Sequence, residues 1–398
     1  MASRVVSRAT LTCVAFLMVA VPVSAIPVHF EVMAPGSTPS GSVLWISGNQ
    51  AGLGQWNGAG VRLSVDADGR HRATLDLPVG TELEFKVTRG GWDTVEKTAT
   101  GAEIANRTWR VTGPRDTVRI EVAGWRDAFE RPVKRESTIV GDVRTHAAFP
   151  SQHVPARDVL VWLPPGYAKD TRQRYPVVVF HDGQNVFDGA TSFLPGQEWR
   201  ADETADRLIR ERRLPPCILV AIANTSARRE EYTLDPDPRY GGGGSERYMR
   251  FVVEELLPFV DRTYRTRTTA VDRTVIGSSL GGLVSLDLAL RHPETFGRAG
   301  VLSPAVWWSD RAVVRRVVAM GKRPVRLWLD IGTVESTPTA EGRREWMEGA
   351  QGLRDALLAA GWREGEDLRY EEVEGAAHNE RAWADRLDRV LLFLQSRP

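Results

Sequence analysis

The chain has 398 residues, of which 42% are hydrophobic and 26% are charged, and its formal net charge at pH 7 is +1. This length exceeds that of one small domain, and the near-zero charge excludes the basic surface that a nucleic-acid partner requires. The chain carries no H-E-x-x-H, C-x-x-C or phosphate-loop motif, so we expect no metal and no other cofactor.

The first 25 residues have the pattern of an export signal. Arg4 and Arg8 precede an apolar run over residues 11–23, and small residues allow cleavage near Ala25. The run is too short to span a membrane comfortably. We therefore expect an exported protein, periplasmic or extracellular, with no membrane span after cleavage.

Residues 26–125 consist of short alternating runs separated by turn residues, as at 72–77 and 83–87. No helical period interrupts them, which predicts a small all-β sandwich. Five of the 13 tryptophans lie in this region, more than a small core needs: Trp45, Trp56, Trp92, Trp109 and Trp125. Residues 126–136 are charged and contain a proline, and they are interpreted as a linker.

Residues 137–398 predict an α/β domain with a mostly parallel sheet and helices on both faces. Buried strand-like runs such as 175–180 and 218–222 alternate with helical patterns. A turn follows the first run, in which the N–H of Gly183 or Gln184 is a candidate donor to an oxyanion. Cys217 precedes the second run and is interpreted as a buried, inert thiol.

A long loop after residue 222 contains Arg228 and Arg229. They are interpreted as a solvated charged segment, with contact to an anionic or catechol-bearing substrate as the alternative.

The segment 274–282 is a β-branched run that ends in G-x-S-x-G and is followed by apolar residues at helical spacing. Only Ser279 has glycines two residues away on both sides, so it stands on the sharp turn between a buried strand and a helix. This context predicts Ser279 as a nucleophile, with the Leu280 N–H directed at a developing oxyanion. Trp307 and Trp308, which follow a later strand-like run, are interpreted as an aromatic wall with Trp199, and local packing is the alternative.

Two carboxylates and one histidine follow in the order expected of α/β-hydrolases. Asp330 lies near the end of the strand-like run 325–332 and Glu335 lies in the loop beyond it. Either can orient a histidine, and we favour Glu335 because a loop beyond the strand end reaches farther. His378 lies in a small-residue loop between the strand-like run 367–373 and a C-terminal helical pattern, where neutral imidazole can accept the serine proton.

Residues 136–398 resemble the esterase D-like esterases, α/β-hydrolases that include feruloyl esterases and enterobactin-type siderophore esterases. The resemblance rests on five ordered blocks, at 180–185, 277–282, 302–308, 330–335 and 377–380 with Trp383. It implies carboxylic ester hydrolysis without a cofactor, with the acid of the triad at the position of Glu335.

Residues 26–125 resemble a starch-binding carbohydrate module at 47–49, 53–56, 84–87 and 106–108. The resemblance implies that Trp56 stacks on a sugar ring and that Lys86 donates to sugar hydroxyls. The second stacking tryptophan of the family falls near Lys97, so Trp92 is the candidate replacement. Binding of α-glucan and a structural role, packing on the catalytic domain or covering its entrance, are the two alternatives.

The sequence thus predicts an exported serine esterase that acts on a small-molecule or glycan-linked ester, with an aryl (feruloyl) or acetyl group. Three alternatives remain open. They are a siderophore esterase, an acyltransferase in which a sugar hydroxyl replaces water, and a glycan-binding protein whose hydrolase domain is inactive.

Overall fold

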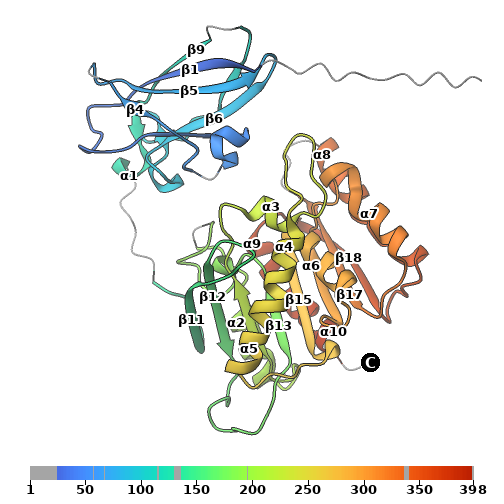
Figure 1. The fold of residues 1–398 in the computed structure, drawn as a ribbon. Coiled ribbons are helices and arrows are strands. Elements are labelled where there is room, and N and C mark those ends of the chain that lie inside the picture. The colour runs from blue at the N-terminus through green and yellow to red at the C-terminus, as the bar shows by residue number, and fades with distance from the viewer. Residues whose placement is uncertain are drawn as a thin grey trace, which may run out of the picture. The chain divides into compact units, whose positions relative to one another are not determined.

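The structure, a computed structural model, describes residues 25–56, 58–66, 68–113, 116–129, 136–194, 196–335 and 340–396. The chain divides into two compact units, which we call unit 1 (Met1–Val133) and unit 2 (Lys134–Pro398) (Figure 1). The predicted export signal lies outside the described residues, apart from Ala25, and so does the linker segment 130–135.

None of the described helices combines the length and the apolar composition that crossing a membrane requires.

Unit 1 is built from short strands and helical turns. The strands are β1 (Ala25–Met33), β2 (Trp45–Gly48), β3 (Val61–Arg62), β4 (Ser64–Val65), β5 (His71–Pro78), β6 (Glu82–Thr88), β7 (Glu96–Lys97), β8 (Arg107–Arg110), β9 (Thr117–Glu121) and β10 (Gly124–Trp125). The turns are η1 (Ala51–Trp56), η2 (Trp92–Thr94) and α1 (Arg126–Phe129). Two four-stranded sheets have the orders β4-β5-β1-β9 and β3-β2-β6-β8, and β10 pairs with β7.

The alternation of side chains along each strand explains why unit 1 is a sandwich. In β1, Val28, Phe30 and Val32 are fully buried, whereas the residues between them face outward. Phe30 meets Phe85 of β6 across the core, with ring centroids 5.8 Å apart in a T-shaped arrangement. The predicted β-sandwich is confirmed.

The first four residues of the segment interpreted as a linker form α1. The Phe129 ring of this helix packs over Gly101 and Gly124, where an added Cβ would lie 2.6 and 2.8 Å from ring atoms. Arg89 and Asp127 form an ion pair. These contacts tie residues 126–129 to unit 1.

Unit 2 contains one eight-stranded sheet. Its strands are β11 (Asp142–Phe149), β12 (Arg157–Leu163), β13 (Val177–Phe180), β14 (Ile218–Ile222), β15 (Arg273–Ser278), β16 (Arg298–Leu302), β17 (Arg326–Val334) and β18 (Leu368–Ala377). The order is β11-β12-β14-β13-β15-β16-β17-β18. The pairs β11–β12 and β12–β14 are antiparallel, and all later pairs are parallel. The carboxyl ends of the parallel strands therefore meet at one edge of the sheet.

Helices cover both faces of this sheet (Figure 1). The helices and helical turns of unit 2 are η3 (Gly183–Asn185), α2 (Ala201–Arg210), α3 (Arg228–Tyr232), α4 (Ser245–Arg250), the π-helical turn η4 (Phe251–Leu256), α5 (Leu257–Thr263), η5 (Ala270–Asp272), α6 (Leu280–Arg291), α7 (Trp308–Met320), α8 (Ala340–Ala359), α9 (Glu380–Ala384) and α10 (Leu387–Gln395).

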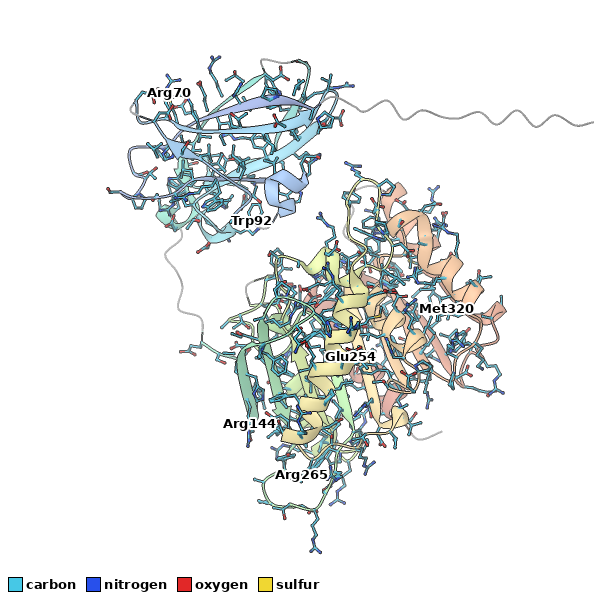
Figure 2. All side chains as sticks on the ribbon, viewed as in Figure 1. Arg70, Trp92, Arg144, Glu254, Arg265 and Met320 are labelled. Atoms are coloured by element: carbon cyan, nitrogen blue, oxygen red, sulfur yellow. The ribbon has the colours of Figure 1, made fainter. Side chains whose placement is uncertain are left out.

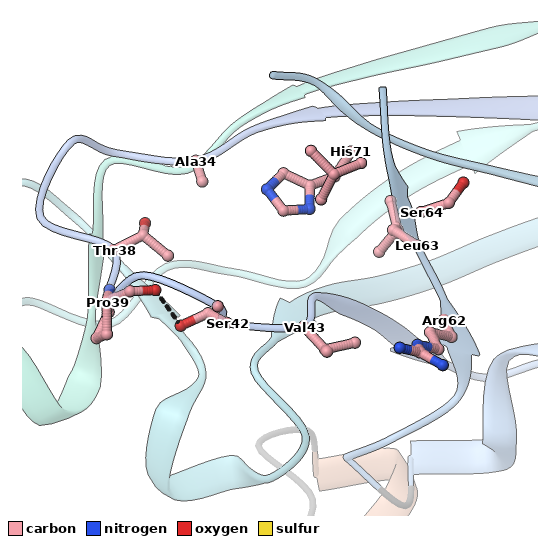
Figure 3. Close-up of a pocket in the computed structure, with 11 residues that line it drawn as sticks. Ala34, Thr38, Pro39, Ser42, Val43, Arg62, Leu63, Ser64 and His71 are labelled. Atoms are coloured by element: carbon pink, nitrogen blue, oxygen red, sulfur yellow. Dashed lines mark hydrogen bonds between the residues drawn. The ribbon is translucent and has the colours of Figure 1, made fainter. Parts of the chain in front are cut away.

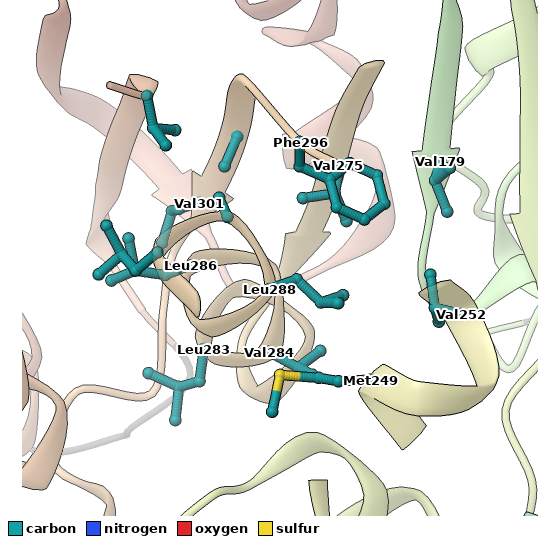
Figure 4. Close-up of a cluster of buried hydrophobic side chains, with 14 of the residues drawn as sticks. Val179, Met249, Val252, Val275, Leu283, Val284, Leu286, Leu288, Phe296 and Val301 are labelled. Carbon is teal, nitrogen blue, oxygen red and sulfur yellow. The ribbon is translucent and has the colours of Figure 1, made fainter. Parts of the chain in front are cut away.

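The sheet is apolar on both faces because helices bury both. In β13, Val177 and Val179 pack with residues of α4 to α8, whereas Val178 and Phe180 pack with residues of α2 and α10. Figure 4 shows part of the cluster that contains Val177 and Val179, with Val179, Val275 and residues of α6 labelled. The predicted α/β-hydrolase fold is confirmed.

Candidate active site

The serine predicted as nucleophile lies on a strained turn. β15 ends at Ser278, α6 begins at Leu280, and Ser279 between them has φ 58° and ψ −124°. Residues other than glycine rarely adopt this conformation, and it is typical of functional turns. A Cβ on Gly277 would lie 2.4 Å from the Gly281 carbonyl oxygen, so the approach of strand and helix requires glycine there.

The turn exposes Ser279 and hides its neighbour. Ser279 is half-buried, whereas Ser278 is buried. The Ser279 N–H donates to the Leu302 carbonyl at 3.1 Å, and the Ser279 carbonyl accepts from the Ala305 N–H at 3.2 Å. The Ser279 hydroxyl makes no hydrogen bond to a described protein atom, which is common for a nucleophile before substrate binds.

His378 and Glu335 lie side by side because of the register of two parallel strands. Val334 of β17 pairs with Ala377 of β18. The residues that follow these two in the sequence are Glu335 and His378. His378 Nδ1 is hydrogen-bonded to Glu335 Oε2, with the carboxylate fully buried and the imidazole 14% exposed. Both strands run farther than the sequence patterns at 325–332 and 367–373 predict, so His378 follows its strand directly rather than a loop.

Asp330, the alternative acid, faces a different partner. It pairs with Glu371 in the sheet, which places it four residues, about 13 Å, before Val334 along the strand. Its carboxylate accepts hydrogen bonds from Arg386 at 2.8 and 3.1 Å and from the Trp328 indole at 2.7 Å. Asp330 and Arg386 form a buried ion pair, and no hydrogen bond described for Asp330 reaches the imidazole.

Ser303 connects the two carboxylates. Its hydroxyl oxygen accepts hydrogen bonds from Arg386 at 2.9 Å and from the Trp383 indole at 3.2 Å. Its one proton is therefore donated to Glu335 Oε1, at 2.7 Å. The Gly332 N–H donates to the same oxygen at 2.9 Å, so one oxygen of Glu335 is satisfied by the protein and the other faces the histidine. Ser303 lies in the block 302–308, but the sequence predicts no role for it, and Arg386 lies outside all five blocks.

The turn after β13 carries further free amides. Asp182 has φ 55° and ψ 46°, and a Cβ on Gly183 would lie 2.6 Å from the Ala221 carbonyl carbon, so glycine is required. The turn adjoins the serine turn, because a Cβ on Gly281 would lie 3.4 Å from Asp182 Oδ2. Among described atoms, the amides of the three predicted oxyanion residues have no acceptor, and these are Gly183, Gln184 and Leu280.

The interpretation of Arg228 as part of a solvated loop is wrong. Arg228 lies in α3 and binds the Asp182 carboxylate through two nitrogens, at 2.7 and 2.8 Å. Burial by itself raises the pKa of Asp182, but the charge and hydrogen bond of Arg228 hold that pKa below its usual range. Arg229 is half-buried and donates to the Tyr240 carbonyl at 3.3 Å.

His181 has a structural role beneath this turn. Its Nδ1 is hydrogen-bonded to the Tyr248 hydroxyl at 2.9 Å. Burial lowers the pKa of His181 to about 3, so the imidazole stays neutral. Cys217 is fully buried, and burial raises the pKa of its thiol to about 12, which agrees with an inert thiol.

The aromatic side chains beside His378 differ in part from the predicted wall. The ring centroid of Trp346, on α8, lies 4.7 Å from that of His378 and 6.2 Å from that of Trp307. Trp346 and Trp307 are both half-buried, so they form a partly exposed aromatic pair beside the histidine. Trp346 could not be predicted from the sequence, because a single tryptophan in a charged helix carries no positional signal.

Trp308 and Trp199 are core residues, and their assignment to a substrate wall is wrong. Trp308 is 5% exposed and its indole donates to the Asp235 carbonyl at 2.8 Å. Trp199 is 2% exposed and packs on Trp383, with ring centroids 5.6 Å apart.

Within the described ranges of the chain, no group of three or more His, Cys, Asp or Glu is arranged to hold a metal ion.

In unit 1, Trp56 and Trp92 form a pair (Figure 2 labels Trp92). Their ring centroids are 6.1 Å apart with an interplanar angle of 33°, and the Trp92 indole donates to the Trp56 carbonyl at 3.0 Å. Both rings are half-buried. Trp92 thus places a second indole beside Trp56, and its role in stacking on sugar stays a prediction.

Lys86 is already engaged by the protein. Its ammonium donates to the Ile104 carbonyl at 2.7 Å and lies 3.5 Å from Glu103, and its side chain is 13% exposed. Lys97 is buried and pairs with the same carboxylate, Glu103.

A separate pocket of about 780 Å³ lies elsewhere on unit 1 (Figure 3). Loop residues 34–43, part of β3 and β4, and His71 line it. None of the three predicted sugar-contact residues, Trp56, Lys86 and Trp92, is among the residues that line this pocket.

Two family models match the chain. Residues 155–394 match the model described as "Putative esterase", and residues 25–119 match the model described as "Starch binding domain".

Some of the known relatives are esterases and others are starch-degrading enzymes. The endo-1,4-beta-xylanase/feruloyl esterase of Xylanibacter ruminicola is 28% identical over 236 residues, which are 58% of this chain and 28% of that protein. The ferri-bacillibactin esterase BesA of Bacillus subtilis is 27% identical over 184 residues, 40% of this chain and 60% of that protein. The alpha-amylase of Niallia circulans is 39% identical over 102 residues, 25% of this chain and 8% of that protein. The matches thus span less than two thirds of each of these three relatives.

A solved ferulic acid esterase has the same fold as most of unit 2. It superposes with a TM-score of 0.51 at 18% sequence identity, over 64% of this chain and 97% of that one.

Replacing Gly277 with alanine should lower the free energy of unfolding by about 1–3 kcal/mol or more, because the new methyl group meets the Gly281 carbonyl. Urea unfolding followed by tryptophan fluorescence measures this. The matched control is Gly352→Ala in α8, where nothing lies within 4 Å of the added carbon. Alanine should stabilise that helix by about 0.5–1 kcal/mol. Equal effects of the two substitutions would contradict the close approach at the serine turn.

Proposed function

Because the chain belongs to the putative esterase family and is a carboxylic ester hydrolase, we propose that it works through an acyl-enzyme formed on Ser279. The Ser279 hydroxyl attacks the ester carbonyl while His378 Nε2 takes its proton. Glu335 holds the imidazole through Nδ1 and stabilises the imidazolium. The proton then passes to the leaving alcohol.

The oxyanion of each tetrahedral intermediate would be bound by the Leu280 N–H and by the N–H of Gly183 or Gln184. Water attacks the acyl-enzyme in the second half of the reaction, and His378 takes the proton of that water. His378 returns this proton to Ser279 Oγ as the acid leaves. No step requires a metal or another cofactor.

One observation carries this proposal. The pairing of Val334 with Ala377 brings Glu335 and His378 together at the sheet edge to which β15 also delivers Ser279. Three residue types that are needed for acyl transfer thus follow the carboxyl ends of three strands of one parallel run. The buried Glu335 carboxylate also accepts hydrogen bonds from the Ser303 hydroxyl and the Gly332 N–H, which hold it in one orientation toward the imidazole.

We infer an aryl ester as the substrate, joined to a glycan. Trp346 lies beside His378 and Trp307 lies beside Trp346, and the two offer partly exposed aromatic faces to an aryl acyl group. The feruloyl esterase named among the relatives agrees with this class. A siderophore ester, named for another relative, is less favoured because Arg228 is already bound by Asp182. Transfer of the acyl group to a sugar hydroxyl would use the same site.

For unit 1 we propose binding of α-glucan through the Trp56–Trp92 pair. Two indoles at 33° can each stack on a pyranose ring of a curved chain. Lys86 is a weaker candidate contact, because it is largely buried and engaged by Ile104 and Glu103. We also propose export, from the pattern of residues 1–25, which lie outside the described residues except for Ala25.

Ser279→Ala should abolish hydrolysis of p-nitrophenyl acetate, lowering kcat by about 10³-fold or more, because the nucleophile is removed. Initial rates at 405 nm measure the loss. Ser278→Ala is the matched control, since it removes the adjacent hydroxyl, which is buried, and should keep most of the activity. Activity that survives in the Ser279 variant would exclude the acyl-enzyme on this residue.

Glu335→Gln should lower kcat by about 10³–10⁴-fold with little effect on KM, because the amide cannot stabilise the imidazolium. Asp330→Asn should instead lower mainly the thermal midpoint, because it leaves the buried Arg386 without its counter-charge. Steady-state kinetics and thermal unfolding of both variants separate the two roles. The reverse pattern would make Asp330 the acid.

Trp56→Ala and Trp92→Ala should each weaken binding of soluble starch at least about tenfold, because each removes one stacking face. Affinity electrophoresis of the full chain measures this. The control is Trp109→Ala, which removes a half-buried tryptophan of β8 outside the pair. If the parent and all three variants migrate through glucan gels as fast as through glucan-free gels, unit 1 does not bind glucan and its role is structural.

A further inference from the structure

Asp182 has a left-handed backbone conformation, which is uncommon for a residue other than glycine. It has φ 55° and ψ 46°, in the left-handed region, although it carries a Cβ. It directly precedes Gly183 and Gln184, whose amides are the candidate oxyanion donors. The direction of those amides therefore depends on what keeps Asp182 in place.

The Asp182 carboxylate accepts hydrogen bonds from the segment that follows β14. Arg228 Nε donates to Oδ1 at 2.7 Å and Nη2 donates to Oδ2 at 2.8 Å, which is a bidentate pair. Asn224 Nδ2 donates to Oδ1 at 2.5 Å, and the Asn224 N–H donates to Gln184 Oε1 at 3.1 Å. Asp182 and Gln184, the residues on either side of Gly183, are thus both bound by the segment after β14.

Other contacts limit the turn on its remaining sides. The Asp182 N–H donates to the Tyr232 hydroxyl at 3.1 Å, and Tyr232 also lies under the Arg228 guanidinium, 5.0 Å from its ring centroid. Gly183 lies against the backbone at the end of β14, so the turn cannot shift in that direction. Arg228 is the one charged partner of Asp182 among these groups.

The pair is largely desolvated. Asp182 is 7% exposed, and the Arg228 side chain is 30% exposed. An aspartate carboxylate buried to this extent needs its counter-charge to remain ionised. Without Arg228, Asp182 would take up a proton or turn toward solvent, and either change releases the left-handed residue.

We propose that the Asp182–Arg228 ion pair orients the oxyanion-binding amides of the Gly183–Gln184 turn, so that Arg228 is a positioning residue that acts through Asp182. This inference rests on the proposed function of the site. It assigns Arg228 to transition-state stabilisation of any ester, whatever the charge of the substrate. Loss of the pair should therefore lower kcat and leave the binding of a small neutral ester almost unchanged.

The test compares Arg228→Lys and Asp182→Asn with the parent in the full chain. Each variant should lower kcat for p-nitrophenyl acetate at least about tenfold, with KM changed less than about twofold. Inhibition by phenylboronic acid should weaken by the same factor as kcat. That probe forms a tetrahedral adduct in which the Ser279 oxygen bonds to boron and a boronate oxygen occupies the oxyanion position.

Arg316 and Asp287 provide a matched control pair. Arg316 binds Asp287 through two nitrogens at 2.9 and 3.0 Å, with side chains 15% and 2% exposed, and joins α7 to α6. Arg316→Lys and Asp287→Asn should lower the thermal midpoint and leave kcat and boronate inhibition of the folded enzyme unchanged. If the control variants lose kcat to the same extent as the turn variants, the role of Arg228 is structural and the proposal fails.

Two other outcomes also overturn the proposal. A rise in KM of the Arg228 variant without a loss of kcat or of boronate affinity would mean that the arginine binds substrate directly. Should Arg228→Lys fail to fold, Asn224→Ala removes one clamp of the same turn, and unchanged kcat in that variant counts against the proposal. Full activity in Ser279→Ala would instead refute the proposed function itself, so the two failures are distinguishable.

Discussion

The register of the parallel strands is the constraint on which the candidate site depends. Parallel strands deliver their carboxyl ends to one edge of a sheet, and a shift of register changes which residues emerge together there. The pairing of Val334 with Ala377 makes Glu335 and His378 neighbours, while Asp330 stays opposite Glu371 within the sheet. Burial on both faces holds this register, because a slip of one residue would exchange the side chains that face the two helical layers.

Buried ion pairs set the directions of the groups around that edge. Asp330 and Arg386 are almost completely buried, and through Ser303 they direct a hydroxyl proton to Glu335. Asp182 and Arg228 hold the turn on the other side of the serine. Burying charge costs free energy that a fold recovers only with good geometry, so such pairs are poor general stabilisers. Their value here is directional, because a bidentate arginine permits one orientation of its carboxylate.

The sequence was least informative about side chains whose environment is made by distant segments. Trp199 lies before α2 and Trp308 lies after β16, yet both are buried. Trp383 of α9 packs on Trp199, and Asp235 in the loop before α4 accepts the Trp308 indole N–H. Arg228 lies in a charged stretch that has the pattern of a solvated loop. Only the fold shows that its guanidinium binds the Asp182 carboxylate. The strand ends were also underestimated, since Glu374 to Ala377 continue β18 despite a glycine and small residues.

The sequence by itself determined the two-part architecture, the serine turn and the chain order of Ser279, the two candidate carboxylates and His378. Hydrophobic periods and glycine spacing act within a few residues, so these features are legible in the chain alone. Only the tertiary structure decided that Glu335 rather than Asp330 meets the imidazole, that Trp346 lies beside it, and that Arg228 is occupied. Each of these depends on register and packing between segments far apart in the chain, which no local pattern encodes.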